Sequence, residues 1–546
     1  MKRKKISIFF ALALVLVLVV SSVGAILAAQ DNPVSGPDSL KESCSSMTAG
    51  RLATVDSYTM SGHTCDGGCD WRLEVIPAAK HKPGDFIVID YPGIPGGFGH
   101  DILGETVIPQ VPETYKWFKV ETPLGNEHQV FIGENTCSTR SELSNIDYDD
   151  ALLDWYWLPA LGLQRGKTAR EVVEIIGGLV EEYGLRGGAE SLLVSDPLEA
   201  WVLEIPGNTT EWVAQRVPDE HVHFHANRVR IGVIDLEDPD NFLASPNLIT
   251  LAQDRGFYDP VTDGPFNFEK TYSRPSSRES MGNRLREWRM VSLLCPSEDW
   301  DPEAITYPFS VEPDELISVE WWINNVWRDS YEGTQFDMTQ GNAAGPFGSP
   351  VRQSISGVSY ARAIATPGSG YTWVSQSRSF LPDAIGGVVW YSMDSGRNSI
   401  FVPFYAGITE TPESWRTGDY TYFSWDSAWW GFQGLDTISQ IRYEDINADV
   451  REVFDAFEKE QFDAQADIEQ QALELYNRTA NLPQAKGKPC EKFLTSYSCD
   501  RAEQAEVVCE DMFYSLLVKY RDGSPRTTVS DEWREWLQWL PPWLTP

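Results

Sequence analysis

The chain has 546 residues, a formal charge of −36, and 42% hydrophobic and 12% aromatic content. This apolar content supplies a large core, and the aromatic content excludes a solvated coil. The acidic excess argues against nucleic acid and anionic membrane surfaces as partners, because both repel such a surface. The composition is typical of a soluble secreted protein and identifies no substrate.

The N-terminus has the order of a secretory signal. A basic segment at residues 2–5 precedes an almost wholly apolar run that ends near residue 27 at small residues. We assign residues 1–29 to a signal peptide or a signal anchor, since the run is long enough to span a bilayer, and residues 30–43 to a propeptide. Export is favoured over anchoring. The expected location is extracytoplasmic, with only transient membrane contact through residues 1–29.

The first half of the chain predicts short strands and one strongly marked helix. The helix is expected from Thr168 to Tyr183, with a capping box formed by Thr168 and Glu171 and an end at Gly184. A hairpin is expected between strands at residues 45–54 and 59–64. Further strands are expected at residues 86–90, 129–134, 191–194, 200–205, 213–217 and 222–231.

The second half mixes short strands and then becomes helical. Strands with Gly/Pro turns are expected within residues 318–404, and a charged helix with one apolar stripe from about 438 to 476. The stripe consists of Val450, Val453, Phe454, Phe457, Phe462, Ile468 and Leu473. The tryptophan-rich end, residues 533–543, is expected to dock on the body. Hairpin strands with helices between groups of them indicate an α+β layered fold.

Eight cysteines are present, and some should pair in an oxidising compartment. Cys65 and Cys69 resemble half a zinc site, but no second half with similar spacing follows. A structural or disulfide role is therefore favoured for this pair. Cys490, Cys499 and Cys509 cluster late in the chain and predict a local disulfide.

Three histidines alternate at His221, His223 and His225, so on a strand their rings would share one face. A metal site is one interpretation. Since no acidic or cysteine partner follows at a defined spacing, a half-exposed strand face is favoured.

Cys44 follows the apolar segment and opens the first expected strand. A cut between Ser43 and Cys44 would leave a thiol and a free α-amine on one residue. An α-amine has a pKa near 8, so a useful fraction is unprotonated at neutral pH and accepts the thiol proton. Cys44 is thus a candidate nucleophile that carries its own base.

The run from Cys44 to Met60 resembles the start of the mature chain in the C69 dipeptidase family. These are N-terminal-nucleophile hydrolases related to penicillin acylases and bile-salt hydrolases. Later segments that resemble the family, in the same order, are residues 190–201, 214–219, Ala226-Asn227-Arg228, Tyr331-Glu332-Gly333-Thr334, 336–337 and 344–348. The similarity extends to about residue 480.

The resemblance implies a four-layer αββα sandwich over residues 44–436, followed by a helical, cysteine-containing region at 437–546. It also implies amide hydrolysis that needs no metal or other cofactor.

The resemblance further implies roles for individual residues. The Cys44 sulfur attacks the scissile carbonyl, Asn227 and Asn135 correspond to oxyanion donors, and Asp66 orients the nucleophile and its amine. Related enzymes carry Arg-x-x-Asp where this chain has His63-Thr64-Cys65-Asp66. His63 is either a pH-dependent substitute for the missing cation or an ordinary strand residue.

The leading hypothesis is an exported cysteine peptidase that hydrolyses dipeptides after cleavage before Cys44. The second hypothesis keeps the chemistry but takes an acyl amide or amino-acid amide as substrate. The third is a catalytically silent extracellular binding protein with Cys44 in a disulfide. The expected partner is a dipeptide or small amide, and the sequence leaves oligomerisation open.

Overall fold

The computed structural model describes residues 44–91, 93–98, 106–352, 360–479, 481–482, 487–523 and 531–539. The expected signal segment and propeptide lie outside these residues. Lys41–Pro546 forms one compact unit. Within the described ranges, no helix is both long enough and apolar enough to cross a membrane.

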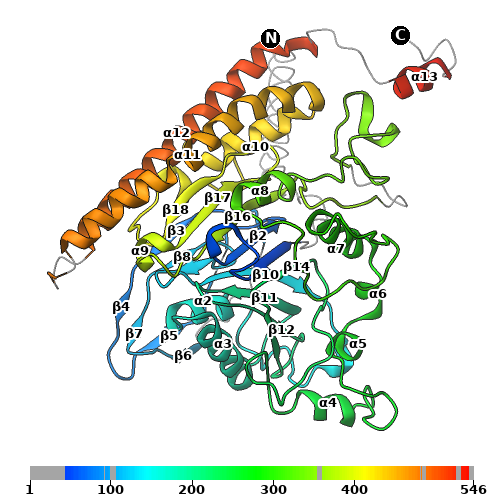
Figure 1. Ribbon diagram of the computed structural model, residues 1–546, viewed down its shortest axis with the longest axis vertical. Helices are drawn as coiled ribbons and strands as arrows, with labels where there is room; N and C mark the ends of the chain where they lie inside the picture. The colour runs from blue at the N-terminus through cyan, green and yellow to red at the C-terminus, as the bar shows by residue number, and fades with distance from the viewer. Residues whose placement is uncertain are drawn as a thin grey trace, which may run out of the picture. The chain divides into compact units, whose positions relative to one another are not determined.

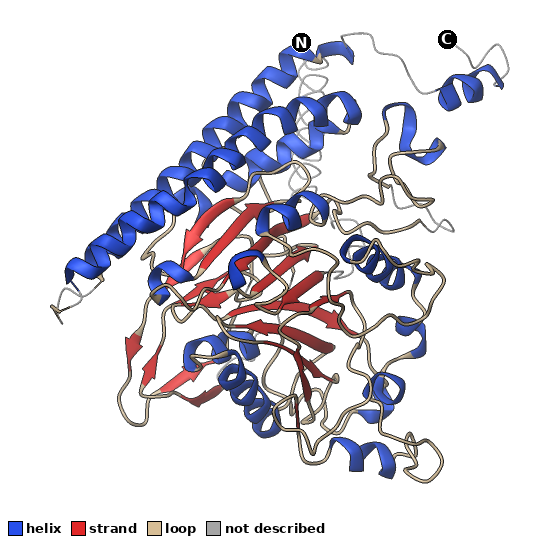
Figure 2. Cartoon of the chain, in the orientation of Figure 1, coloured by secondary structure: helices blue, strands red, loops and turns tan. Residues whose placement is uncertain are grey.

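Two antiparallel sheets form the centre of the fold (Figure 1, Figure 2). The first contains, in spatial order, β14 (Val222–His225), β1 (Ser45–Ala49), β2 (Met60–Asp66), β16 (Ser369–Gln376), β17 (Val388–Met393) and β18 (Val402–Tyr405). The second contains β15 (Phe242–Ala244), β13 (Val213–Val217), β12 (Ala200–Ile205), β11 (Ala189–Ser195), β10 (Phe131–Cys137), β9 (Gly125–Asn126), β8 (Trp117–Lys119) and β3 (Glu74–Ile76). Two small sheets pair β4 (Ala79–Lys80) with β7 (Glu113–Thr114) and β5 (Phe86–Val88) with β6 (Val107–Pro109).

The expected mixture of helices and antiparallel strands is confirmed, so the fold is α+β. The α-helices are α2 (Trp157–Arg165), α3 (Ala169–Tyr183), α4 (Leu248–Asp254), α5 (Phe268–Tyr272), α6 (Pro275–Arg278), α7 (Met281–Leu294), α8 (Val319–Asn325), α9 (Asp383–Gly386), α10 (Ala428–Ser439), α11 (Tyr443–Thr479), α12 (Lys488–Lys519) and α13 (Asp531–Trp539). Short 3-10 helices are η1 (Val55–Ser57), η2 (Ser141–Leu143), η3 (Asn342–Phe347), η4 (Glu413–Arg416) and η5 (Arg521–Gly523).

Helix α3 begins and ends where the sequence predicts. The Thr168 hydroxyl accepts the amide N–H of Glu171 at 3.2 Å and so satisfies one free donor of the first turn. Gly184 ends the helix with φ of 70°, a left-handed value that favours glycine. Its buried face packs against β11 and β12 of the second sheet.

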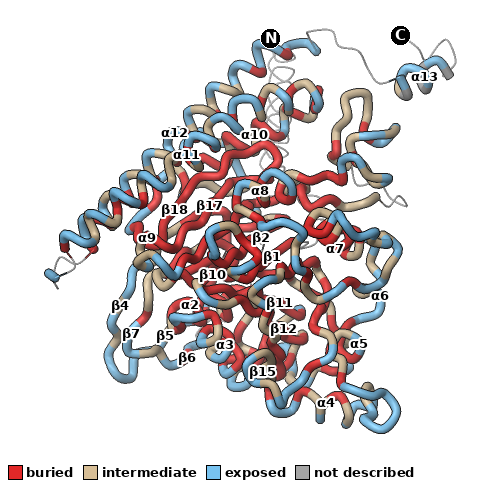
Figure 3. Tube along the Cα trace, in the orientation of Figure 1, coloured by how far each residue is buried: buried red, intermediate tan, exposed pale blue. Residues whose placement is uncertain are grey.

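The two sheets contact each other through polar as well as apolar side chains. The Ser46 hydroxyl on β1 donates to the Glu134 carbonyl on β10 at 2.9 Å, and Ser61 donates to Ser195 at 2.8 Å. At Gly133 the approach is close, because an added Cβ would lie 3.1 Å from the Ser46 Cβ. Figure 3 shows that the strands of both sheets are largely buried. The polar contacts therefore lie in the interior, where they fix the relative position of the two sheets.

Helices α10, α11 and α12 cover β17 and β18 of the first sheet (Figure 1). Six of the seven apolar residues expected in the α11 stripe pack in or against the core, and Val453 does not. Val450 and Phe454 are buried, whereas Val453 is 40% exposed, because Val453 and Phe454 are adjacent and point about 100° apart on a helix. The expected boundary between residues 436 and 437 falls inside α10.

The expected disulfide among the late cysteines is wrong. Cys490, Cys499 and Cys509 all lie on α12 and keep their thiols. A helix rises 1.5 Å per residue, so neighbouring cysteines of this set are roughly 13–15 Å apart along the axis, beyond disulfide reach.

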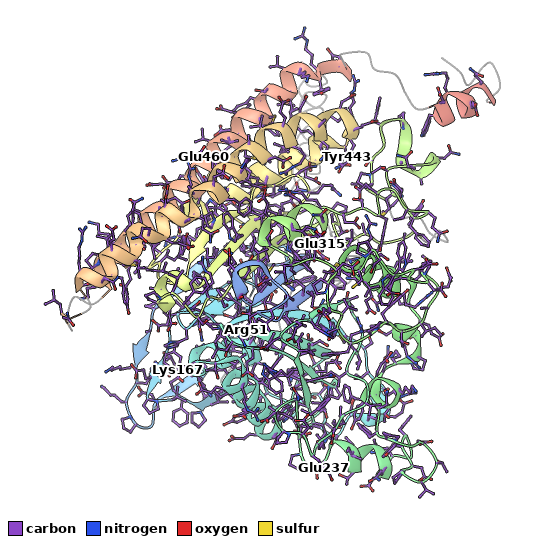
Figure 4. The ribbon with its side chains drawn as sticks, viewed as in Figure 1. Arg51, Lys167, Glu237, Glu315, Tyr443 and Glu460 are labelled. Carbon is purple, nitrogen blue, oxygen red and sulfur yellow. A yellow bond between two sulfur atoms is a disulfide. The ribbon has the colours of Figure 1, made fainter. Side chains whose placement is uncertain are left out.

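Acidic side chains lie both in the interior and on the surface. Figure 4 labels three exposed examples on separate parts of the fold, Glu237, Glu315 and Glu460. At the C-terminal end α13 contacts η3, while Trp543 lies outside the described residues.

Candidate active site

Cys44 immediately precedes β1 and is 3% exposed. β1 pairs with β2 on one side and β14 on the other, with Ser45 opposite Thr64 and Ser46 opposite His225. The Cys44 side chain lines a small cavity between the ends of the two sheets. The other lining residues are Cys65, Phe98, Glu121, Glu134, Thr136 and Trp155.

The main chain of Cys44 is held by donors from two distant parts of the sequence. Asn135 Nδ2 on β10 donates to the Cys44 carbonyl at 2.7 Å, and Arg286 Nη1 on α7 donates to the same oxygen at 2.8 Å. Arg286 also donates to Ser45 Oγ at 2.8 Å. These contacts fix the start of β1 and with it the direction of the Cys44 side chain.

Asn227 joins the same hydrogen-bond network through Arg286. Its Oδ1 accepts from Arg286 Nη2 at 2.7 Å, and its Nδ2 donates to the Thr136 carbonyl at 2.9 Å. Arg286 is fully buried, and burial, together with the like charge of Arg362, lowers its pKa.

Asn135 differs from the expected oxyanion donor. Its Nδ2 also donates to the His225 carbonyl, at 3.4 Å, so both amide hydrogens go to backbone carbonyls. In this geometry Asn135 positions Cys44, and the expected oxyanion role requires the amide to turn.

Asp66 lies at the end of β2, buried, with a defined set of donors. Its carboxylate accepts the Ser369 hydroxyl at 2.5 Å and forms an ion pair with Arg362. Burial raises the pKa of Asp66, and the Arg362 charge and the Ser369 hydrogen bond oppose that rise.

Arg286 and Arg362 are site residues that the sequence analysis did not identify. Arg286 lies 242 residues from Cys44 and Arg362 lies 296 residues from Asp66, so no local pattern marks them. Arg362 is held in turn by Tyr331, whose hydroxyl donates to the Arg362 carbonyl at 2.6 Å. The family-like segment that begins at Tyr331 therefore supports the partner of Asp66.

Of the two roles that the sequence left open for His63, the structure does not support the substitute for the missing arginine cation. Its ring is fully buried, and burial lowers its pKa to about 3, so it is neutral at ordinary pH. The ring lies among polar groups, with Nδ1 3.0 Å from Ser46 Oγ and Nε2 3.3 Å from Thr122 Oγ1. Arg362 and Arg286 supply the positive charge beside Asp66 instead.

Cys65 and Cys69 are joined by a disulfide that brackets Asp66, and Cys44 keeps its thiol. The Cys44 sulfur, the Cys65 sulfur and one ring nitrogen of His63 all lie within 4.8 Å of one another. A metal does not suit this set, because a disulfide sulfur lacks the thiolate charge that binds one.

Two of the three alternating histidines are not on a half-exposed face, whereas His221, just before β14, is partly exposed. His223 and His225 are both fully buried, with His223 Nε2 3.1 Å from His225 Nδ1. Burial lowers the pKa of both rings and raises the pKa of neighbouring Glu204 to about 8. These two rings form part of the polar layer between the sheets, because alternate side chains of β14 face the second sheet, where His225 lies beside Cys137 of β10 and Glu204 of β12.

A buried cysteine whose carbonyl is held by an amide and a guanidinium group, near a buried acid paired with a cation, is an arrangement that suits hydrolytic chemistry. The model described as Peptidase family C69 matches residues 100–456. The chain belongs to this family, as its motifs predict. The matched segment contains Asn135, Asn227, Arg286 and Arg362 and begins downstream of Cys44.

Curated relatives carry dipeptidase names. A probable dipeptidase of Latilactobacillus sakei is 26% identical over 416 residues, which cover 73% of this chain and 81% of that protein. A probable dipeptidase B of Lactococcus lactis is 26% identical over 411 residues, covering 71% and 80%. Dipeptidase A of Lactobacillus helveticus is 28% identical over 252 residues, covering 46% and 50%.

Proposed function

We propose that this protein is an exported dipeptidase that uses Cys44 as its N-terminal nucleophile once residues 1–43 are removed. The observation that carries the proposal is the hydrogen-bond network in which Asn135 and Arg286 both donate to the Cys44 carbonyl and Arg286 also donates to Asn227, with Cys44 itself lining a cavity. The C69 family match and the names of the relatives support dipeptides as the substrate class. The fold we assign is the four-layer αββα sandwich of N-terminal-nucleophile hydrolases.

In the proposed reaction the Cys44 thiol gives its proton to its own α-amine as the sulfur attacks the scissile carbonyl carbon. The amine then passes this proton to the departing amino acid, which leaves a thioester on Cys44. Water attacks the thioester, the amine accepts a proton from it, and the thiol is restored. No other base is required.

The charge of the buried cations acts on both partners of this proton transfer, the thiol and the α-amine. Arg286 contacts the Cys44 carbonyl, and its positive charge disfavours a protonated amine nearby while favouring the thiolate. Asp66, paired with Arg362, is assigned to orient the amine. Asn227 is assigned to the oxyanion through its second Nδ2 hydrogen, and loss of such a donor typically costs about 10²–10³ in rate.

The N-terminal mass and sequence of purified protein, with thiol alkylation, test this proposal. We expect a chain that begins at Cys44, an alkylatable Cys44 and turnover of a dipeptide panel that Cys44→Ala abolishes. Cys137→Ala, which changes another buried thiol, is the matched control. Full activity in Cys44→Ala, or activity on acyl amides alone, would refute the dipeptidase assignment. A chain that begins near Gln30 with Cys44 oxidised would instead favour a silent binding protein.

A further inference from the structure

The cavity that contains the Cys44 sulfur has a composition that amide hydrolysis alone does not require. Its walls include two carboxylates, Glu121 and Glu134, and two aromatic side chains, Phe98 and Trp155. Both glutamates are buried, with exposed fractions of 0% and 3%. Carboxylates beside aromatic faces are a chemical environment that selects a cation.

We propose that Glu134, together with Glu121, binds the α-ammonium group of the substrate residue whose carbonyl is attacked. This inference rests on the proposed function of Cys44. In a dipeptide the α-nitrogen is two bonds from the scissile carbonyl carbon. When Cys44 Sγ reaches that carbon, the ammonium group is therefore close to the sulfur, and Glu134 and Glu121 are the two carboxylates of the cavity that Cys44 lines.

The two carboxylates are held in place before substrate arrives. Glu134 lies on β10, its amide N–H points to His63 Nδ1 at 3.4 Å, and its Oε1 accepts from Thr136 Oγ1 at 3.2 Å. Glu121 Oε2 accepts the amide N–H of Asp70 at 2.7 Å. Preorganised acceptors bind a cation with little loss of side-chain freedom.

The cavity thereby discriminates between substrate classes. An N-acylated substrate brings a neutral amide to the place of the ammonium group, and it loses the attraction of two buried carboxylates. A site built for a charged, hydrogen-bonding group strongly rejects an analogue that lacks it, because the desolvated partners gain nothing in return. Glu134 is thus a residue that determines specificity for a free N-terminus.

Matched substrates test this assignment. Alanylalanine and N-acetyl-alanylalanine present the same scissile bond, and we expect wild-type kcat/KM to be at least about 100-fold higher for the free amine. Glu134→Gln should lower kcat/KM for the free dipeptide by about 10- to 100-fold, the range for loss of a charged hydrogen-bond partner, and change the acetylated one less than threefold. Glu74→Gln, on β3 and paired with Lys119 outside the cavity, is the control.

Each outcome separates this inference from the proposed function. Equal hydrolysis of both substrates by wild type overturns the ammonium site but leaves the Cys44 chemistry intact, whereas hydrolysis of neither refutes the proposed function. An equal loss on both substrates in Glu134→Gln would indicate a structural role and overturn the assignment. If that variant does not fold, Glu121→Gln and the wild-type ratio provide the same test.

A second inference comes from the sulfur positions. Ser45 pairs with Thr64, so the next place in this antiparallel register puts Cys44 opposite Cys65. Opposed residues of antiparallel strands have Cα atoms about 4.5–5.5 Å apart, which is within the range that a disulfide spans. The Cys44 and Cys65 sulfurs already lie within 4.8 Å of each other.

We infer that Cys44 undergoes reversible thiol–disulfide exchange with Cys65, which blocks the nucleophile. The Cys44 thiolate attacks Cys65 Sγ, the Cys44–Cys65 bond forms, and the Cys65–Cys69 bond breaks. Cys69 leaves as a thiolate and takes the proton that Cys44 released, so no outside oxidant or reductant takes part. The product is an inactive chain with a Cys69 thiol.

Peptide mapping of mature protein tests the exchange. The protein is held without substrate, under argon with a chelator, and its thiols are then blocked with N-ethylmaleimide. We expect a Cys44–Cys65 peptide with alkylated Cys69, increasing as the pH is raised, and an equal loss of activity that dithiothreitol restores. Cys69→Ser should give no such peptide and no such loss, and Cys499→Ser should behave as wild type. Absence of the Cys44–Cys65 peptide in wild type at every pH would overturn the inference.

Discussion

Replacement of Arg286 by methionine is the most direct test of how the site is built. Arg286 Nη1 donates to the Cys44 carbonyl at 2.8 Å, and Nη2 donates to Asn227 Oδ1 at 2.7 Å. It also donates to Ser45 and Asn283. The side chain is fully buried, so methionine fills most of its volume but leaves these acceptors without their donor.

The expected loss follows from these contacts. A hydrogen bond to a charged donor contributes about 1.5–3 kcal/mol, so losing the bonds to Cys44 and Asn227 removes about 3–6 kcal/mol. At about 1.4 kcal/mol for each factor of ten, kcat/KM should fall by about 10²–10⁴. Arg286→Lys keeps the charge but reaches fewer acceptors, and an intermediate value is expected.

The assay is kcat/KM on a dipeptide, measured only on protein whose sequence begins at Cys44, together with urea unfolding. Arg284→Met is the matched control, because Arg284 lies on the same helix and donates to backbone carbonyls outside the site. Activity of Arg286→Met within threefold of wild type would refute the role of Arg286 in this network. A loss of activity that is fully explained by a smaller folded fraction would refute it as well.

Four further predictions concern pH and stability. Arg362→Gln removes a charge that lowers the pKa of Asp66, so the acidic limb of the kcat/KM profile should move to higher pH; an unmoved limb would contradict the pairing. The pKa of His63 is about 3 in the folded protein, below the unfolded value of 6.5. The stability that His63 contributes to the folded state is therefore fully present above pH 6.5 and is lost as the pH falls toward 3. His63→Gln should therefore reduce the slope of urea-derived stability in that window by up to about 1.4 kcal/mol per pH unit. Glu204 has the opposite effect on the pH dependence of stability, because its pKa is about 8 in the folded protein and 4.5 ordinarily. The free energy of unfolding therefore declines as the pH rises between these two values, and Glu204→Gln should remove a slope of about 1.4 kcal/mol per pH unit. Thr168→Ala should lower the free energy of unfolding by about 1 kcal/mol without changing kcat/KM, and an unchanged stability would refute the capping role.

Local sequence determined much of the molecule. The capping box, the apolar periodicity and Gly184 define α3 within a few neighbouring residues, so its limits could be read directly. The strands at 200–205 and 213–217 were also predicted, from short apolar segments that follow the Asp196-Pro197 turn. The family, and with it the candidates Cys44 and Asn227, followed from several short motifs in a fixed order.

Other features depend on contacts between residues far apart in the sequence. The burial of His223 arises because a second sheet covers β14, and alternation alone cannot tell a covered face from an exposed one. The separation of three late cysteines followed from one continuous helix, whose rise keeps them apart.

The composition of the site itself was decided only by tertiary structure. The sequence left His63 open as either the cation near Asp66, because it occupies the local position of the expected arginine, or an ordinary strand residue. In the fold, burial keeps that ring neutral, and Arg286 and Arg362 reach the site from distant segments. A charged side chain is placed by the packing of whole elements. Local sequence therefore identified Cys44 and Asp66 as candidate site residues, but only the folded chain identified the cations beside them.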